Sequence, residues 1–191
     1  MLKVILATTS PYRKEIFGFL GIPFEGIGSN VDESKLERND PEELVRELSK
    51  LKAEAVAKDR SDSIVIGLDS VGYFNNRIFE KPKSKEEDFE RLKSLSRSTH
   101  QFYTGIHMIN TASGKSLSRV VKTEVLMRQI TEEEINKYLA EDERFNTYSL
   151  GYDPIKHYSA SFVKEIRGSY YNLLGGIPLE TIVEMLKEIQ A

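Results

Sequence analysis

The start of the chain joins a short apolar run to a helix-start signal. Lys3–Ala7 (KVILA) is apolar with β-branched residues at its centre, which predicts a buried strand. Ser10 and Pro11 are typical of a helix N-cap and of a first helical position. The helix is expected to reach about Leu20 and to end at Gly21. A strand, a polar turn and a helix N-terminus in this order are the general architecture of an anion site, because free backbone N–H groups face the turn.

Further along the chain, apolar runs alternate with helix signals. Asp40 predicts the N-cap of a second helix, and Ser63–Leu68 (SIVIGL) predicts a second buried strand that ends at Asp69. Val71–Phe79 predicts a hairpin, and a third helix is expected from Ser84. Phe102–Ile109 and Ser118–Met127 predict two paired strands. A short helix is expected from Thr131 and a last helix from Pro178. Residues 140–176 are expected to be rich in loops, and no helix or strand bounds are assigned there. The expected fold class is α/β, a mixed β-sheet with flanking helices.

Length, charge and cysteine content narrow the classes of function. With roughly 150 residues per domain, a chain of 191 residues is expected to form a single domain spanning 1–191. The net charge of −3 provides no basic field for a nucleic acid polymer, and no stretch approaches the roughly 18 apolar residues that cross a membrane. The absence of Cys excludes disulfides, thiolate zinc sites and Cys nucleophiles. We therefore expect a soluble, cytoplasmic protein with neither nucleic acid nor membrane as a partner.

Asp69 is a candidate functional carboxylate because of its place in the expected sheet. It stands at the carboxyl end of the strand predicted over Ser63–Leu68, and ligands bind at that end of the strands in open α/β sheets. On position alone, a turn-forming Asp before a hairpin is an equally good interpretation. The other charged residues around the predicted turns favour the functional one.

Three further sites with charged residues accompany Asp69. Asp32 and Glu33 are adjacent carboxylates on a loop, which suits a hard cation such as Mg²⁺, although a solvated loop or the cap of a following turn is the alternative. Arg13 lies in the first turn of the first helix, where a cation opposes the helix dipole unless it serves an anion. Lys81 follows the predicted hairpin, and a surface role is its alternative.

Taken together, these segments resemble the Maf family of nucleoside triphosphate pyrophosphatases. The matching segments, in the order of the family, are LATTSPYRKE (6–15), VDE (31–33), LKAEAVA (51–57), GLDSV (67–71), EKP (80–82), FYTG (102–105) and GSYYNLLGGIPL (168–179). They cover essentially the whole chain. The resemblance implies a Maf- and ITPase-like fold, in which two lobes surround a deep cleft, and a homodimer.

The resemblance also implies a reaction and roles for individual residues. The reaction is hydrolysis of nucleoside triphosphates, including modified ones, to the monophosphate and pyrophosphate with a divalent metal cation, Mg²⁺ or Mn²⁺. Asp69 is implied as the general base, and Glu33 with Asp69 as metal ligands. Four residues match phosphate-binding positions of the family: Ser10, Arg13, Lys52 and Lys81.

Three positions depart from the family's pattern for thymidine and uridine triphosphates. Tyr12 stands where those members carry Arg, Ser70 where they carry Thr, and Gly151 nearest their Gln. The branch that resembles a 7-methylguanosine triphosphate enzyme has an aromatic at the first position but Glu near the third. This sequence matches neither branch, so its base preference stays open. Tyr12 either stacks on a base or packs on the first helix.

Two alternatives to this enzyme remain at the level of sequence. One is a nucleotide-binding regulator of cell division that retains the cleft and turns over little, which the altered specificity positions favour. The other is a house-cleaning enzyme for deaminated purine nucleotides, which shares the chemistry. Pyrophosphate release and the preferred base distinguish the three.

Overall fold

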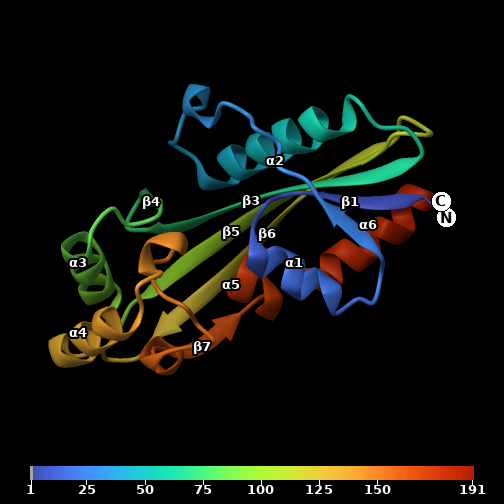
Figure 1. Cartoon of the computed structure of the whole chain (residues 1–191). Coiled ribbons are helices and arrows are strands. Elements are labelled where there is room, and N and C mark those ends of the chain that lie inside the picture. Colours follow the sequence, from blue (N-terminus) through green and yellow to red (C-terminus); the bar gives the residue numbers. More distant parts are fainter. Residues whose placement is uncertain (1) are drawn as a thin grey trace.

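A mixed sheet of seven strands forms the centre of the computed structural model, which describes residues 2–191 (Figure 1). The strand order is β2-β1-β3-β5-β6-β7, and β4 pairs with β3 outside this order. The strands are β1 (Lys3–Ala7), β2 (Phe24–Gly26), β3 (Ser63–Phe74), β4 (Arg77–Phe79), β5 (Thr99–Asn110), β6 (Ser116–Met127) and β7 (Val163–Arg167). The helices are α1 (Pro11–Gly18), α2 (Pro41–Ala57), α3 (Lys85–Leu95), α4 (Glu132–Glu141), α5 (Tyr170–Gly175) and α6 (Leu179–Gln190). The predicted fold class, a mixed sheet with flanking helices, is confirmed.

Strand β3 is longer than the sequence pattern predicted. The run Ser63–Leu68 is a strand, but the prediction that it ends at Asp69 is wrong, because β3 continues to Phe74. β5 pairs with β3 in one uninterrupted antiparallel register over Ile64–Tyr73, and this ladder carries the strand past Asp69. The parallel partner β1 stops earlier, at Ala7. Asp69 therefore lies inside β3, just beyond the carboxyl end of β1.

Helices cover both faces of the sheet (Figure 1). α1 and α6 pack on one face, where Phe17 and Ile182 belong to a core shared with β1, β3 and β5. α2 packs on the other face, where Val56 contacts the core residues of β1 and β3. Gly67 in β3 allows this close approach, since a Cβ at that position would lie 2.0 Å from the carbonyl oxygen of Ser49. The sheet is thus buried on both sides around the carboxyl end of β1.

A second apolar core lies at the other end of the long strands. It is formed chiefly by α3, α4 and the segment after α4, with Leu92, Ile135 and Tyr152 among its buried members. β5 links the two cores, because Ile106 belongs to the first and Phe102 to the second. Two cores on one continuous sheet make two lobes, as the family resemblance implied.

Residues 140–176 hold short elements that the sequence did not predict. Two 3₁₀ turns lie at Phe145–Thr147 and Tyr158–Ser161, and β7 and α5 follow. β7 is an edge strand whose residues are half-buried or exposed, so it shows no continuous apolar run. α5 has six residues and begins at the N-cap Ser169. Helices this short depend on tertiary packing rather than on their own sequence pattern.

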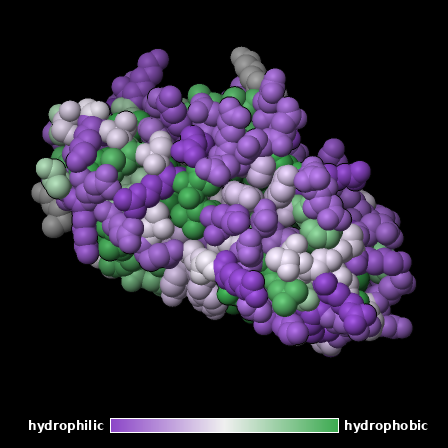
Figure 2. Space-filling view, turned by 180° about the vertical axis from the view of Figure 1, so that it is seen from behind, coloured by the Kyte–Doolittle hydropathy of each residue, from purple (hydrophilic) through white to green (hydrophobic). Residues whose placement is uncertain are grey.

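Hydrophilic side chains cover most of the face shown in Figure 2, and hydrophobic residues form small groups between them. The larger apolar side chains are instead concentrated in the two cores. Of the helices within residues 2–191, none has the length and apolar character needed to span a membrane.

Candidate functional site

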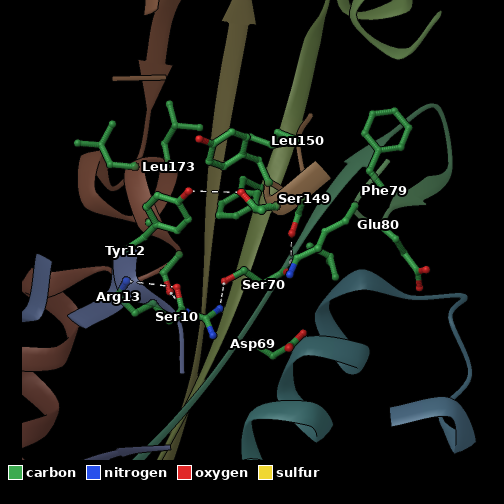
Figure 3. A pocket seen from close by; sticks show the side chains of 18 of the residues that line it. Ser10, Tyr12, Arg13, Asp69, Ser70, Phe79, Glu80, Ser149, Leu150 and Leu173 are labelled. Carbon is green, nitrogen blue, oxygen red and sulfur yellow. Dashed lines mark hydrogen bonds between the residues drawn. The ribbon is translucent and has the colours of Figure 1, made fainter. Parts of the chain in front are cut away.

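A cavity of about 450 Å³ lies between the two lobes (Figure 3). Its wall draws on both lobes: α1 and α2 contribute from one, the segment after β4 and residues 147–154 from the other, and β3 and α5 complete it. Eight of the positions that the sequence indicated line it: Ser10, Tyr12, Arg13, Glu33, Lys52, Asp69, Ser70 and Lys81. Lys81 reaches it from the connection between β4 and α3.

Asp69 occupies the floor of this cavity with two partners from other elements. The Nζ atom of Lys52, on α2, lies 2.6 Å from Oδ1 of Asp69 and 2.8 Å from Oε1 of Glu33. Burial raises the pKa of Asp69 above its ordinary value, and the negative charge of Glu33 adds to this effect. The positive charges of Lys52 and Arg13 oppose it by lowering that pKa. The arrangement is a buried carboxylate whose protonation depends on three neighbouring charges.

Arg13 reaches across the cavity floor from the first turn of α1. Its Nη1 donates to the carbonyl oxygen of Leu68 at 2.9 Å, and its Nη2 donates to Oγ of Ser70 at 2.8 Å (Figure 3). Its Nε donates to the carbonyl oxygen of Gly176 at 3.3 Å. Burial lowers the pKa of the guanidinium, and Asp69 counteracts this. A guanidinium has five N–H donors, so three of them tie α1 to β3 and α5, and two remain for an anion.

Ser10 and Lys81 contribute in different ways. The Oγ atom of Ser10 accepts a hydrogen bond from the backbone N–H of Arg13 at 3.4 Å, so Ser10 caps α1 as predicted and brings the helix N-terminus to the cavity. Lys81 is exposed at the rim. A helix N-terminus and a flexible rim cation are both suited to an anionic ligand.

Tyr12 belongs to an aromatic part of the wall. Its ring lies 5.5 Å from the ring of Tyr148, and the guanidinium of Arg144 lies 5.3 Å from the centre of its ring. Its hydroxyl group is 3.3 Å from Oγ1 of Thr147. Tyr12 thus packs on the segment after α4 and faces the cavity. Its contacts are not limited to its own helix.

Ser70 is held by hydrogen bonds at the base of the cavity. Its Oγ atom is 2.8 Å from Oγ1 of Thr104 on β5, and it also accepts the hydrogen bond from Arg13. Because these partners occupy the hydroxyl group, Ser70 shapes the floor and fixes the orientation of Arg13.

Gly151 is not brought to the cavity with the other positions. Its neighbours Leu150 and Tyr152 line the wall, whereas Gly151 turns toward α3. Its φ angle is +82°, and a Cβ at this position would lie 1.9 Å from Oδ1 of Asp88. Two structural features therefore favour glycine at position 151: the left-handed backbone conformation and the close contact with Asp88.

Several residues that line the cavity were not predicted as site residues from the sequence. Arg38 and Glu80 form an ion pair at the rim, and Phe79, Tyr148 and Ser149 line the wall nearby. Glu80 lies in the EKP segment, so the motif that indicated Lys81 could also have indicated Glu80. Phe79 lies on β4, inside the predicted hairpin, whereas Arg38, Tyr148 and Ser149 reach the wall through the folding of loops, for which the sequence carries no local signal.

The carboxylates of the cavity fit a divalent cation that is bound together with a phosphate ligand. Among the side chains described within residues 2–191, no group of three or more His, Asp or Glu residues could hold a metal ion by itself. Asp69 and Glu33 nevertheless meet at one ammonium group, that of Lys52. Mg²⁺ is commonly held by one or two carboxylates plus substrate phosphates and waters. The donor set therefore fits this second kind of site and not a preformed cage.

Comparisons with known proteins place the chain in one family. The family model described as Maf-like protein matches residues 3–189. A dTTP/UTP pyrophosphatase of Bacillus anthracis (strain CDC 684) and one of Bacillus cereus (strain ZK / E33L) are each 39% identical over 188 residues, which is 98% of this chain and 96% of each relative. A solved HAM1 protein from Coxiella burnetii is 14% identical and has a TM-score of 0.56, with 98% of this chain and 100% of that chain covered, so it shares the fold. The chain belongs to the Maf-like protein family.

Proposed function

We propose that the protein is a nucleoside triphosphate pyrophosphatase, which releases a nucleoside monophosphate and pyrophosphate. The observation that carries this proposal is the buried Asp69 carboxylate, 2.6 Å from the Lys52 ammonium in a cavity lined by further cations. The relatives named dTTP/UTP pyrophosphatase support the same class of reaction. Because one cavity draws on both lobes, we also propose that 1–191 acts as a single domain.

The cations of the cavity would bind the triphosphate. Its several negative charges must be neutralised before water attacks phosphorus. Lys81 and Arg38 lie at the rim, where long side chains adapt to the phosphate chain, and Lys52 lies deeper beside Asp69. Arg13 has a double role in this proposal: three donors keep the floor in place, and the remaining two face a phosphate oxygen.

Asp69 would act as the general base. Burial raises its pKa, which makes its ionised form a better proton acceptor near neutral pH. Asp69 takes a proton from water as the water oxygen bonds to phosphorus, and the bridging P–O bond between the α- and β-phosphates breaks. Lys52 holds the carboxylate in place and favours its ionised form.

Glu33 and Asp69 would hold the divalent cation, Mg²⁺ or Mn²⁺. When bound, this cation neutralises phosphate charge and polarises the bond to be broken. Lys52 contacts both carboxylates, so it keeps them close together and limits their repulsion. This role is independent of which cation binds.

The aromatic wall would receive the base. Tyr12 and Tyr148 present ring surface to the cavity, and Arg144 stabilises Tyr12 from its face. Base–aromatic stacking tolerates different bases, whereas polar groups discriminate between them. We propose that Tyr12 stacks on the base and that Ser70 affects specificity through Arg13. Gly151 would affect it only through the loop that carries Leu150.

The test is product analysis with a panel of standard and modified nucleoside triphosphates and Mg²⁺ or Mn²⁺, beginning with dTTP and UTP. Monophosphate and pyrophosphate in equal amounts are expected, and D69N serves as the control for a contaminating enzyme. Release of orthophosphate alone would overturn the proposed bond. Binding without any product would favour the regulator, and a strong preference for inosine or xanthosine triphosphate would favour the enzyme for deaminated purines.

A further inference from the structure

Helix α3 buries two ionisable side chains that do not line the cavity. Arg91 is 9% exposed and Asp88 is fully buried. Burying an ionisable group is costly unless the group has partners or loses its charge, so the surroundings of both side chains must meet this cost. Both side chains contact segments that form the cavity wall.

Arg91 joins two wall segments that are far apart in the sequence. Its Nη1 donates to the carbonyl oxygen of Glu80 at 2.6 Å and to the carbonyl oxygen of Ser149 at 3.0 Å. Its guanidinium also lies 4.8 Å from the centre of the Phe79 ring. Glu80, Ser149 and Phe79 all line the cavity, and Figure 3 shows Ser149 next to the Phe79–Glu80 segment.

Two more contacts from α3 support the same wall. Glu87 accepts a hydrogen bond from Nη2 of Arg91 at 3.0 Å and one from the backbone N–H of Lys83 at 2.9 Å. Asp88 packs against Gly151, the residue that follows Leu150 of the wall. Both oxygens of Asp88 lack a hydrogen-bond partner among the described residues, and Arg91 is the cation that interacts with it. α3 therefore supports both segments from behind.

We propose that Arg91 is a positioning residue that sets the separation of the Phe79–Lys81 and Tyr148–Leu150 segments, and thereby the width of the nucleotide cavity. The inference rests on the proposed function for its kinetic consequence, but its structural part does not. Hydrogen bonds from a charged donor are stronger than those from a neutral one. Without them the two carbonyl groups lose a shared partner, and the segments separate or move independently.

The chain offers a matched control in Arg128. Its guanidinium also lies over an aromatic ring, 5.7 Å from the centre of Phe162, and it also donates to backbone carbonyl oxygens, those of Ser161 and Gln129. None of these residues lines the cavity. R128M therefore removes the same kinds of contact without touching the wall.

The experiment compares R91M, R91K and R128M by amide hydrogen exchange, thermal unfolding and steady-state kinetics. R91M is expected to exchange faster at 79–81 and 148–150, with KM for the best nucleotide raised about tenfold and kcat changed by less than about threefold. R91K retains N–H donors and is expected to restore most of the protection and of KM. R128M is expected to lower Tm while KM and exchange at both segments match the wild type.

The outcomes separate the inference from the proposed function. Wild-type exchange at both segments in R91M, or an equal KM change in R128M, would overturn the inference. If R91M does not fold, R91K decides it, because full loss of protection with no KM change would contradict positioning of the cavity. If the wild type releases no pyrophosphate, the proposed function fails, and hydrogen exchange still decides whether Arg91 holds the two segments.

Discussion

The ammonium group of Lys52 lies between the carboxylates of Asp69 and Glu33, at 2.6 Å and 2.8 Å. The three residues come from β3, α2 and the 3₁₀ turn Glu33–Lys35, so the trio exists only in the folded chain. One cation that serves two carboxylates limits their mutual repulsion and opposes the effect of burial on the pKa of Asp69. The neighbouring charges thus determine the pKa of Asp69, and replacement of a neighbour is expected to change that pKa.

Replacement of Asp69 tests the general base directly. D69N keeps the size of the side chain and an oxygen for Lys52, so folding and nucleotide binding are expected to persist. Turnover is expected to fall by about 10²–10⁴-fold, the usual contribution of a general base. Pyrophosphate release, Tm and nucleotide affinity are measured together. Turnover close to that of the wild type would remove Asp69 from the mechanism.

Replacement of Lys52 is expected to move the pH profile. Lys52 lowers the pKa of Asp69, so K52M raises that pKa further, and the carboxylate is ionised only at higher pH. The acidic limb of kcat/KM should therefore shift to higher pH in K52M. Lys50 is exposed on the same helix and does not line the cavity, so K50M is the control and should leave the limb unchanged. Equal pH profiles of kcat/KM for K52M and K50M would show that Lys52 does not control the ionisation of Asp69.

Lys81 and Lys83 form a matched pair for the phosphate-binding proposal. Both are exposed, but only Lys81 lines the cavity. K81A is expected to raise KM for the triphosphate by about tenfold, because it removes a cation near the phosphates. K83A is expected to leave KM unchanged. Equal KM values for K81A and K83A would show that Lys81 is a solvated surface residue with no role in binding the triphosphate.

Much of the fold could be predicted from local patterns. Ser10, Asp40, Ser84 and Thr131 are all observed as N-caps, because capping depends on a few neighbouring residues. The end of β3 could not be predicted in this way, since it depends on the long ladder with β5. The short elements β7 and α5 form by packing on distant strands, which no local pattern records.

The site was predictable only in part. Asp69 and Glu33 were candidates from their local sequence, and Lys52 was indicated by the family resemblance. The contact between the three could not be predicted, because they are far apart in the sequence. Arg91 gave no signal, since a polar residue on a helix usually faces solvent. Gly151 was predicted as a specificity position, and its neighbours Leu150 and Tyr152 line the cavity. Its contact with the buried Asp88 is visible only in three dimensions.

Asp88 is expected to make the stability of the protein depend on pH. Burial raises its pKa from 3.8 to about 8, Glu87 and Asp142 add to this, and Arg91 opposes it. Between these values the unfolded chain has lost the proton and the folded chain has kept it. The stabilisation is therefore complete below about pH 4 and is lost as pH rises to about 8, by at most about 1.4 kcal/mol per pH unit.

D88N removes this titration and provides the measurement. Urea unfolding of D88N and of the wild type is compared at intervals from pH 5 to pH 8. The variant is expected to gain stability relative to the wild type as pH rises. A difference that stays constant over this range would show that Asp88 does not titrate there.

Gly151 and Gly114 allow the contact with Asp88 to be separated from backbone strain. Both have a left-handed φ, +82° and +75°, but only Gly151 has a neighbour where a Cβ would lie. G114A is expected to cost about 1–2 kcal/mol from the backbone alone, and G151A about 1–3 kcal/mol more, because its Cβ meets Asp88. The double variant D88A/G151A should recover that additional loss relative to D88A, as measured by urea unfolding. If G151A and G114A cost the same, Asp88 does not press on the loop, and the cavity wall has no support from that side chain.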